Sequence, residues 1–205
     1  SGSIFQNDQH CLLISGLGKD RAGTATKLLG QSKAKKNEGW LNLGIAGHGS
    51  LAKGDAFIAG KIVDDKSEDV FYPPPISHSS LPVSSLCTSS SRVTQYEPGM
   101  GYDMEAHSFY REASRFSFRE FVQVVKIVSD TPSHPIEKIR PREATEMIAS
   151  HMNQLDQLVL QIDQLAMEVQ PDEQIEKMAQ EILSLHHFSV TRTHQLRELL
   201  RHAKM

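Results

Sequence analysis

The chain has 205 residues, of which 39% are hydrophobic and 23% are charged, and its formal net charge is -3 at pH 7. This composition is typical of a globular protein whose length allows one domain with a full hydrophobic core. The slight negative charge offers no basic footprint for a nucleic-acid partner, and no apolar run approaches the roughly 20 residues that span a membrane. Two cysteines are too few for a disulfide scaffold or a zinc site, so we expect a cytoplasmic protein.

The N-terminal part of the sequence predicts a strand, a helix and a second strand. Residues 10–15 form a short apolar run that stops at the glycine turn of residues 16–19. Asp20 can cap the helix that follows, and residues 40–47 predict a strand that runs into another glycine turn. A strand, a helix and a strand at this spacing form a βαβ unit, so we expect the two strands to be parallel.

The middle of the chain predicts further strands separated by polar segments. Residues 56–63 predict a third strand, and residues 83–88 a short one inside a serine-rich stretch. The prolines at 73–75 exclude their segment from the centre of a sheet, because proline donates no ladder hydrogen bond. A helix is expected over residues 104–116. The unbroken apolar run at 121–128 is typical of a strand that is buried on both faces.

The C-terminal part predicts helices only. A long helix is expected from Pro141 to about residue 169, a second over 171–185, and a last one from 191 or 193 to the end. We therefore divide the chain into an α/β domain, residues 4–169, and a C-terminal helical extension, residues 170–205. The domain is expected to be a three-layer α/β/α structure with a mostly parallel or mixed central sheet.

Two acidic residues near the middle of the chain are the main candidates for chemistry. Glu105 lies where the chain leaves a glycine-rich bend and enters a helix, and Asp130 ends the apolar run. Ligands in open α/β sheets bind outside the carboxyl ends of strands, so we expect Asp130 to face a ligand and Glu105 to share its cavity. The structural alternatives are that Asp130 caps a turn and that Glu105 is a first-turn acid favoured by the helix dipole. Asp103 is more simply a cap.

Four motifs in order resemble those of the purine nucleoside phosphorylase and nucleosidase superfamily. The likeness is greatest to the branch that hydrolyses methylthioadenosine and S-adenosylhomocysteine. Each motif is weak by itself, but four in order at compatible spacings are specific, and together they cover about residues 12–130 and the helix after Pro141. The motifs are Ser15-Gly16-Leu17-Gly18-Lys19, Asn42-Leu43-Gly44-Ile45-Ala46-Gly47 followed by Gly54-Asp55, Asp103-Met104-Glu105-Ala106, and Ile127-Val128-Ser129-Asp130.

The resemblance implies cleavage of the N-ribosyl bond of a purine nucleoside or thionucleoside, with water as the expected acceptor. Asp130 would protonate the imidazole nitrogen of the leaving base, and Ser129 would hold that aspartate. Glu105 would bind the ribose hydroxyls, and Met104 would pack against the sugar. The other substrate-binding candidates are Ala46, Gly47, Lys126 and His48.

This chemistry suits the residue types. The transition state for breaking an N-glycosidic bond resembles a sugar cation, which a nearby carboxylate stabilises. An acid at the end of an apolar strand is favoured in its protonated form by burial, and can then assist the leaving group. No cofactor or metal is implied, and phosphate would be a co-substrate only in a phosphorylase. A homodimer is expected, with a small-molecule nucleoside as the ligand and no nucleic-acid or membrane partner.

Some positions depart from the pattern of the family. The nucleosidases carry an N-terminal strand ending in a glutamate that positions water, and nothing ahead of Ile4 supplies it. Lys126 stands where the family commonly has arginine and lacks the planar fork that binds an anion through two bonds, which weakens a phosphorolytic reading. Ile45 replaces a small hydroxyl residue, and the segment between residues 63 and 101 lacks a helix. A nucleoside phosphorylase and a non-catalytic nucleoside-binding or scaffold relative remain the alternatives.

Overall fold

The structure is a computed structural model. It describes residues 3–33, 38–74, 76, 79–135, 139–168, 173–185, 188, 192–193, 195–196 and 199–200. The chain divides into two compact units, residues 1–166 and 167–205. The second unit contains α5 (Glu173–Leu185), which confirms the helix expected there, although its predicted start at 171 lies outside the described residues. Most of the last predicted helix also lies outside them.

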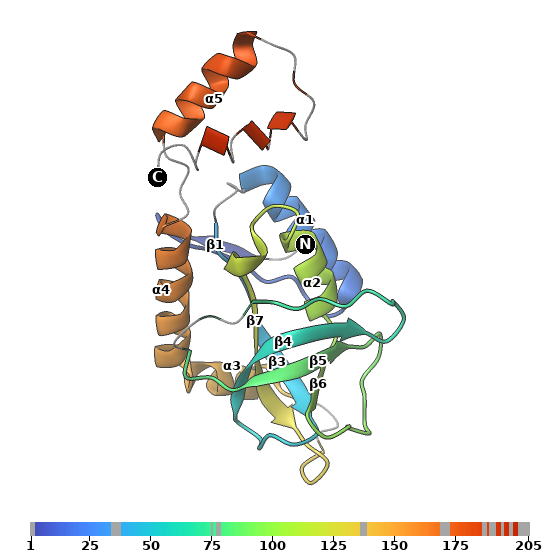
Figure 1. The fold of residues 1–205 in the computed structure, drawn as a ribbon. Helices are drawn as coiled ribbons and strands as arrows, with labels where there is room; N and C mark the ends of the chain where they lie inside the picture. Colours follow the sequence, from blue (N-terminus) through green and yellow to red (C-terminus); the bar gives the residue numbers. More distant parts are fainter. Residues whose placement is uncertain are drawn as a thin grey trace. The chain divides into compact units, whose positions relative to one another are not determined.

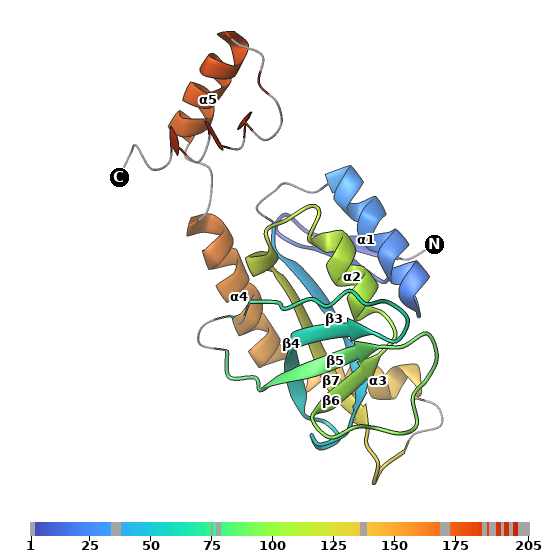
Figure 2. The same ribbon diagram turned by 45° about the vertical axis from the view of Figure 1, so that its right-hand side comes forward.

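A five-stranded mixed sheet that closes on itself forms the centre of the first unit (Figures 1 and 2). Its strands run in the order β3–β6–β5–β4–β7, and β7 pairs back with β3. The β3–β7, β4–β5 and β5–β6 pairs are parallel, whereas β3–β6 and β4–β7 are antiparallel. The strands are β3 (Trp40–His48), β4 (Ala56–Asp64), β5 (Val83–Thr88), β6 (Met100–Asp103) and β7 (Val122–Asp130).

The predicted N-terminal βαβ unit is wrong. The strand expected at residues 10–15 is β2 (Cys11–Leu13), which pairs antiparallel with β1 (Ile4–Gln6) in a separate two-stranded sheet. A bond of 3.0 Å from the Asn7 N–H to the His10 carbonyl closes this hairpin. An apolar run identifies a strand but not its partner, and here the parallel partner of β3 is β7, which comes from much later in the chain.

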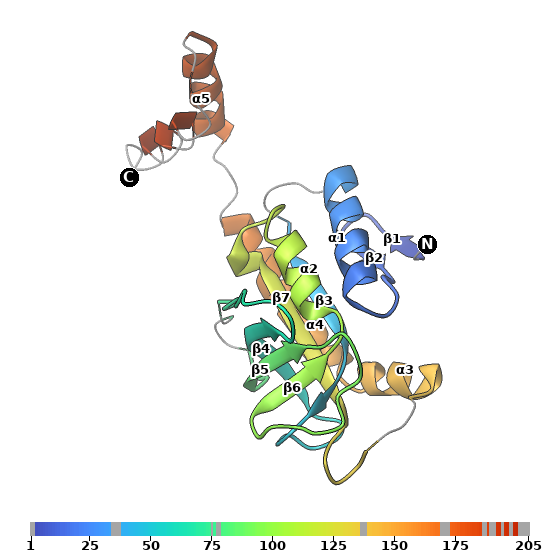
Figure 3. The same cartoon turned by 90° about the vertical axis from the view of Figure 1, so that its right-hand side faces the viewer.

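Helices cover the sheet on both sides, which confirms the three-layer arrangement. Figures 1 and 3 show α1 (Lys19–Lys33) beside α2 (Ala106–Ala113), and α2 packs on β3, β4 and β7. Helix α4 (Met152–Glu168) packs on the other side, where its apolar stripe joins a buried cluster with Val125 and Ile127 of β7. Because α1 begins at Lys19, Asp20 lies in its first turn and is not its cap, which corrects the prediction.

The single helix predicted from Pro141 is two helices. α3 (Pro141–Ala149) ends before α4 begins at Met152, and His151 lies at the break. The His151 Nε2 atom is 2.7 Å from the carbonyl oxygen of Gly54, which ties the break to the loop between β3 and β4. Apolar periodicity runs through both helices, so the sequence pattern does not reveal the break at which His151 contacts this loop.

Side chains of β7 alternate between two apolar clusters, and this alternation decides where its polar residues lie. Val124 and Val128 belong to the cluster that includes residues of α2, whereas Val125 and Ile127 belong to the cluster that includes residues of α4. Since strand residues alternate between faces, Lys126 lies on the same face as Val124 and Val128.

We predict opposite effects for alanine at two glycines of α1. A Cβ atom at Gly30 would lie 2.3 Å from the nearest atom of the Phe116 ring, whereas one at Gly23 would lie 3.4 Å from Ser108 Cβ, an ordinary contact. Gly30→Ala should lower the free energy of unfolding by about 1–3 kcal/mol through overpacking. Gly23→Ala should raise it by about 0.5–1 kcal/mol, because alanine favours a helix. Urea unfolding followed by circular dichroism measures both, and equal effects would contradict this packing.

Candidate functional site

The strands that carry the two acidic motifs flank the same residue of β3. Gly47 pairs with Asp130 of β7 on one side and with Tyr102 of β6 on the other. Neighbouring strands lie about 4.8 Å apart, so Asp130 and the segment that leads to Glu105 approach β3 from opposite sides. The β3–β7 register shifts between Ala46 and Gly47, and such irregularities often redirect a side chain next to a site.

The Asp130 carboxylate is buried and surrounded by donors. The Ser129 hydroxyl donates a short hydrogen bond to Oδ1, and the Tyr96 hydroxyl donates one to Oδ2. A guanidinium nitrogen of Arg92 lies 3.9 Å from Oδ2. Ser129 therefore stands where the sequence resemblance implies that it holds Asp130. The Tyr96 hydroxyl and the Arg92 guanidinium both lie beside Oδ2.

The sequence analysis missed Tyr96 and Arg92. Both lie in the loop of residues 89–99 between β5 and β6, within a polar stretch that shows no periodicity. Burial and the hydrogen bond and charge of Asp130 raise the pKa of Tyr96 to about 12. The available signal was an aromatic residue and an arginine in a loop next to a strand that carries a candidate acid motif. That signal is weak, because loops commonly expose such residues.

Glu105 is engaged with the glycine turn before α1. Its Oε1 atom accepts a hydrogen bond of 2.8 Å from the backbone N–H of Gly18. Gly18 has a φ of +100°, a conformation that residues with a side chain rarely adopt. The next residue, Lys19, begins α1 and forms ion pairs with Asp64, at 2.5 Å, and with Asp65. The structure thus brings the first and third motifs together. Met104, beside Glu105, is half-buried.

Lys126 lies beneath the site and is not open to a ligand in this structure. Its Nζ atom forms a fully buried ion pair of 2.8 Å with Asp103 Oδ2. The side chain crosses β3 at its register partner Gly44, where an added Cβ would lie 3.2 Å from Nζ. Asp103 also accepts hydrogen bonds from the Thr88 hydroxyl, at 2.6 Å, and from the Ala106 N–H, at 2.8 Å. Asp103 therefore holds the start of α2 through the Ala106 N–H, although the N-cap residue is Glu105 and not Asp103, which corrects the prediction.

His48 is a buried residue whose two ring nitrogens are both used within the protein. Nδ1 accepts hydrogen bonds from the backbone N–H groups of Ser50, at 3.0 Å, and Leu51, at 2.9 Å. The proton is therefore on Nε2, which is 2.8 Å from the Ser84 hydroxyl oxygen. Burial lowers the pKa of His48, and Asp55 opposes this effect only in part. The ring thus fixes the loop after β3, and its predicted contact with substrate stays a prediction.

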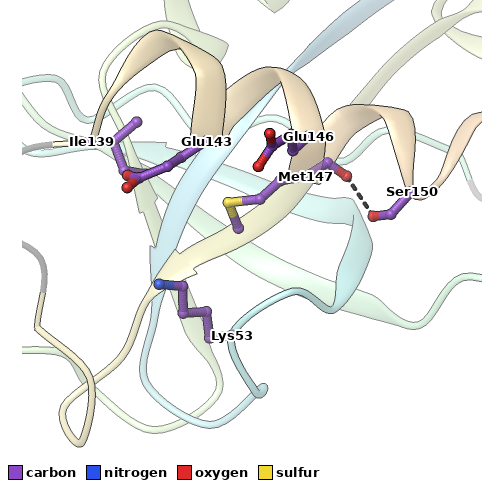
Figure 4. Close-up of a pocket in the computed structure, with 6 residues that line it drawn as sticks. All are labelled: Lys53, Ile139, Glu143, Glu146, Met147 and Ser150. Carbon is purple, nitrogen blue, oxygen red and sulfur yellow. Dashed lines mark hydrogen bonds between the residues drawn. The ribbon is translucent and has the colours of Figure 1, made fainter.

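The open cavity expected between Glu105 and Asp130 is not one of the two hollows that the structure describes. One hollow, of about 380 Å³, lies between Lys53 and α3, with the side chains drawn in Figure 4. The other, of about 810 Å³, lies between the loop 49–54 and the turn 131–134. Neither acid lines either hollow. Asp130 lines neither hollow because the Tyr96 side chain occupies the space beside its carboxylate.

Among the described residues, no group of three or more histidine, cysteine, aspartate or glutamate side chains is arranged to hold a metal ion. Within the same residues, no helix is long and apolar enough to cross a membrane. Both cysteines, Cys11 and Cys87, are free thiols.

Comparison with known proteins identifies the fold. No family model matches the sequence, and no curated protein matches it by sequence. Three similar solved structures are nucleosidases. The Campylobacter jejuni 5'-methylthioadenosine/S-adenosylhomocysteine nucleosidase has a TM-score of 0.59 and 11% identity, over 76% of this chain and 87% of that chain. A putative methylthioadenosine nucleosidase from Weissella paramesenteroides has a TM-score of 0.56 and 18% identity, over 80% and 88%.

The third is the methylthioadenosine/S-adenosylhomocysteine nucleosidase of Colwellia psychrerythraea in complex with adenine. It has a TM-score of 0.52 and 16% identity, over 78% of this chain and 85% of that chain. The resemblance stated from the four motifs is therefore confirmed at the level of the fold.

We predict that Lys126→Met strongly destabilises the protein. The substitution leaves the buried Asp103 carboxylate without its counter-charge, which typically costs about 3–5 kcal/mol of unfolding free energy. The double variant Lys126→Met/Asp103→Asn should lose less, because no uncompensated charge remains. Lys66→Met, at an exposed lysine, is the control and should change stability by less than about 0.5 kcal/mol. A loss at Lys126 no larger than that of the control, in guanidinium unfolding, would contradict the ion pair.

We predict that His48 makes the fold sensitive to acid. Its pKa is lowered in the folded protein, so its contribution to stability is present above the unfolded value of about 6.5 and is lost as the pH falls. His48→Asn keeps an acceptor near the position of Nδ1 and removes the titration. The unfolding free energy should therefore fall less between pH 7 and pH 5 in the variant than in the wild type. Parallel curves in urea titrations would show that His48 does not titrate in this way.

Proposed function

We propose that this protein cleaves the N-ribosyl bond of a purine nucleoside or thionucleoside, with water as the acceptor. The observation that carries the proposal is the pairing of Gly47 with Asp130 on one side and with Tyr102, three residues before Glu105, on the other. This pairing brings the end of β7, at Asp130, and the end of β6, which leads into Glu105, to the two sides of one glycine. The nucleosidase fold supports the same assignment.

In this proposal Asp130 acts as the general acid. The carboxylate takes up a proton from solvent and donates it to the imidazole nitrogen of the purine as the bond to the sugar breaks, so that the base leaves as a neutral molecule. Water adds to the sugar carbon and releases its proton to solvent. Ser129 donates to Oδ1, which leaves Oδ2 as the oxygen that faces the base. Burial at the end of β7 excludes water from the carboxyl group, which strengthens its interaction with a bound base.

Glu105 acts on the sugar. Its carboxylate would bind the ribose hydroxyls and stabilise the positive charge that develops on the ring. The buried pair of Lys126 and Asp103 supports this role indirectly, because Asp103 accepts hydrogen bonds from the N–H groups of Ala106, at 2.8 Å, and Glu105, at 3.3 Å. The charge of Lys126 would thus position Glu105 without contacting substrate. Ala46 and Gly47 would line the ribose side of the site.

One observation favours a second candidate, a non-catalytic relative that binds nucleosides. The hydrogen bond from Tyr96 to Asp130 covers the oxygen that the base would need. A protein that only binds a nucleoside does not require a proton at this position. Binding of methylthioadenosine without release of adenine would support this candidate over the hydrolase.

The expected homodimer also stays a prediction. Light scattering after gel filtration measures the oligomeric state.

We predict that Asp130→Asn lowers the rate of adenine release from methylthioadenosine by about 10²- to 10⁴-fold, since it removes the general acid and keeps the shape of the side chain. Glu105→Gln should lower the rate by about 10²-fold or more, because an amide does not stabilise a sugar cation as a carboxylate does. Release is measured by chromatography, with and without phosphate, after circular dichroism confirms folding.

The control is Tyr72→Phe, at an exposed tyrosine. It should release adenine at the wild-type rate. A rate that requires phosphate would replace hydrolysis by phosphorolysis. Full activity of both the Asp130 and the Glu105 variants would contradict the assignment of the site.

A further inference from the structure

We propose that Tyr96 occupies the base position of the site and that a purine binds by displacing its hydroxyl from Asp130. This inference rests on the proposed function. The loop of residues 89–99 thereby contributes a side chain that competes with the base for Asp130, the one group expected to contact it.

The first argument is the shared partner. The Tyr96 hydroxyl donates to Asp130 Oδ2, and Oδ1 is already satisfied by Ser129. A purine that takes a proton from Asp130 must reach the same oxygen as the phenol. The two cannot occupy it together, because the phenol oxygen already lies within hydrogen-bonding distance on that side.

The second argument is how closely the ring fits the strand beneath it. A Cβ atom at Gly47 would lie 2.5 Å from Tyr96 Cε1, so the ring lies directly against a backbone position that only glycine leaves open. Gly47 is also the residue that pairs with Asp130. A flat aromatic group on this glycine, with a polar atom on Oδ2, has the same character as a purine bound at the end of β7.

The third argument is the neighbouring aromatic ring. The ring of Tyr102 lies 5.7 Å from that of Tyr96, at an interplanar angle of 54°. Offset and tilted aromatic pairs at this separation are favourable, so a purine that replaces Tyr96 finds an aromatic neighbour already in place. Arg92, half exposed and 3.9 Å from Asp130, lies in the same loop and would move with it.

The contact itself can be tested at neutral pH by nuclear magnetic resonance. The chain has four tyrosines, so ¹³Cζ labelling yields few signals, and the one lost in Tyr96→Phe belongs to Tyr96. Asp130→Asn should shift this signal, because it replaces a charged acceptor with a neutral one. Saturating adenine should shift it in the same direction, because the hydroxyl leaves the carboxylate.

Affinity supplies the second readout. Calorimetric titration with adenine should show Tyr96→Phe binding about 10-fold more tightly than wild type, since a hydrogen bond to a charged group that must be broken is removed. Tyr72→Phe, the exposed tyrosine, should bind as wild type does. Binding by Tyr96→Phe together with no binding by wild type would also support the displacement.

The outcomes separate this inference from the proposed function. If wild type releases adenine from methylthioadenosine but adenine leaves the Tyr96 signal unmoved, the displacement is overturned and the nucleosidase stands. The same holds if Tyr96→Phe binds adenine no more tightly than wild type. If neither wild type nor Tyr96→Phe binds adenine or methylthioadenosine, both proposals fail.

Discussion

The rest of the site depends on the buried ion pair between Lys126 and Asp103. An ion pair this deep in the protein persists only where both charges are fully partnered. Asp103 meets that condition with the Lys126 ammonium, the Thr88 hydroxyl and backbone N–H groups at the start of α2. Asp103, at the end of β6, therefore joins β7, β5 and α2 at the base of the site. Because Asp103 also accepts a hydrogen bond from the Glu105 N–H, its pairing with Lys126 helps to position Glu105 through the backbone.

Strand β3 allows this arrangement because its residues there are small. Gly44 lets Lys126 cross from β7 toward Asp103, and Gly47 lets Tyr96 reach Asp130. The glycine-rich motif thus has two effects in this chain. It brings the neighbouring strands into contact through their side chains, and it leaves a flat surface on which an aromatic ring can lie. A larger residue at either glycine would separate groups that now meet.

Local patterns were informative where burial alone decides the structure. The apolar run before Asp130 predicted a strand buried on both faces, and β7 has that form. The place of Asp103 before a helix suggested a cap, but the N-cap residue is Glu105, and Asp103 bonds to the start of the helix from two residues earlier. The pairing partners of the strands were harder to predict, because an apolar run does not specify which strand it pairs with. Strand β2, for example, pairs with β1 in a separate hairpin. The helix expected from Pro141 divides at His151, whose contact with a distant loop has no local pattern.

The sequence by itself determined the class of fold and singled out Glu105 and Asp130 as candidates, because motif order and hydrophobic pattern are properties of the chain alone. Only the tertiary structure decided what those acids touch. Tyr96 covers Asp130, and Lys126 lies beneath it, because strand register and closure of the sheet bring these residues together. Gly18 reaches Glu105 because α1 packs on α2. The Tyr96–Asp130 and Gly18–Glu105 contacts join residues that are 34 and 87 positions apart, so they leave no mark on any short stretch of sequence.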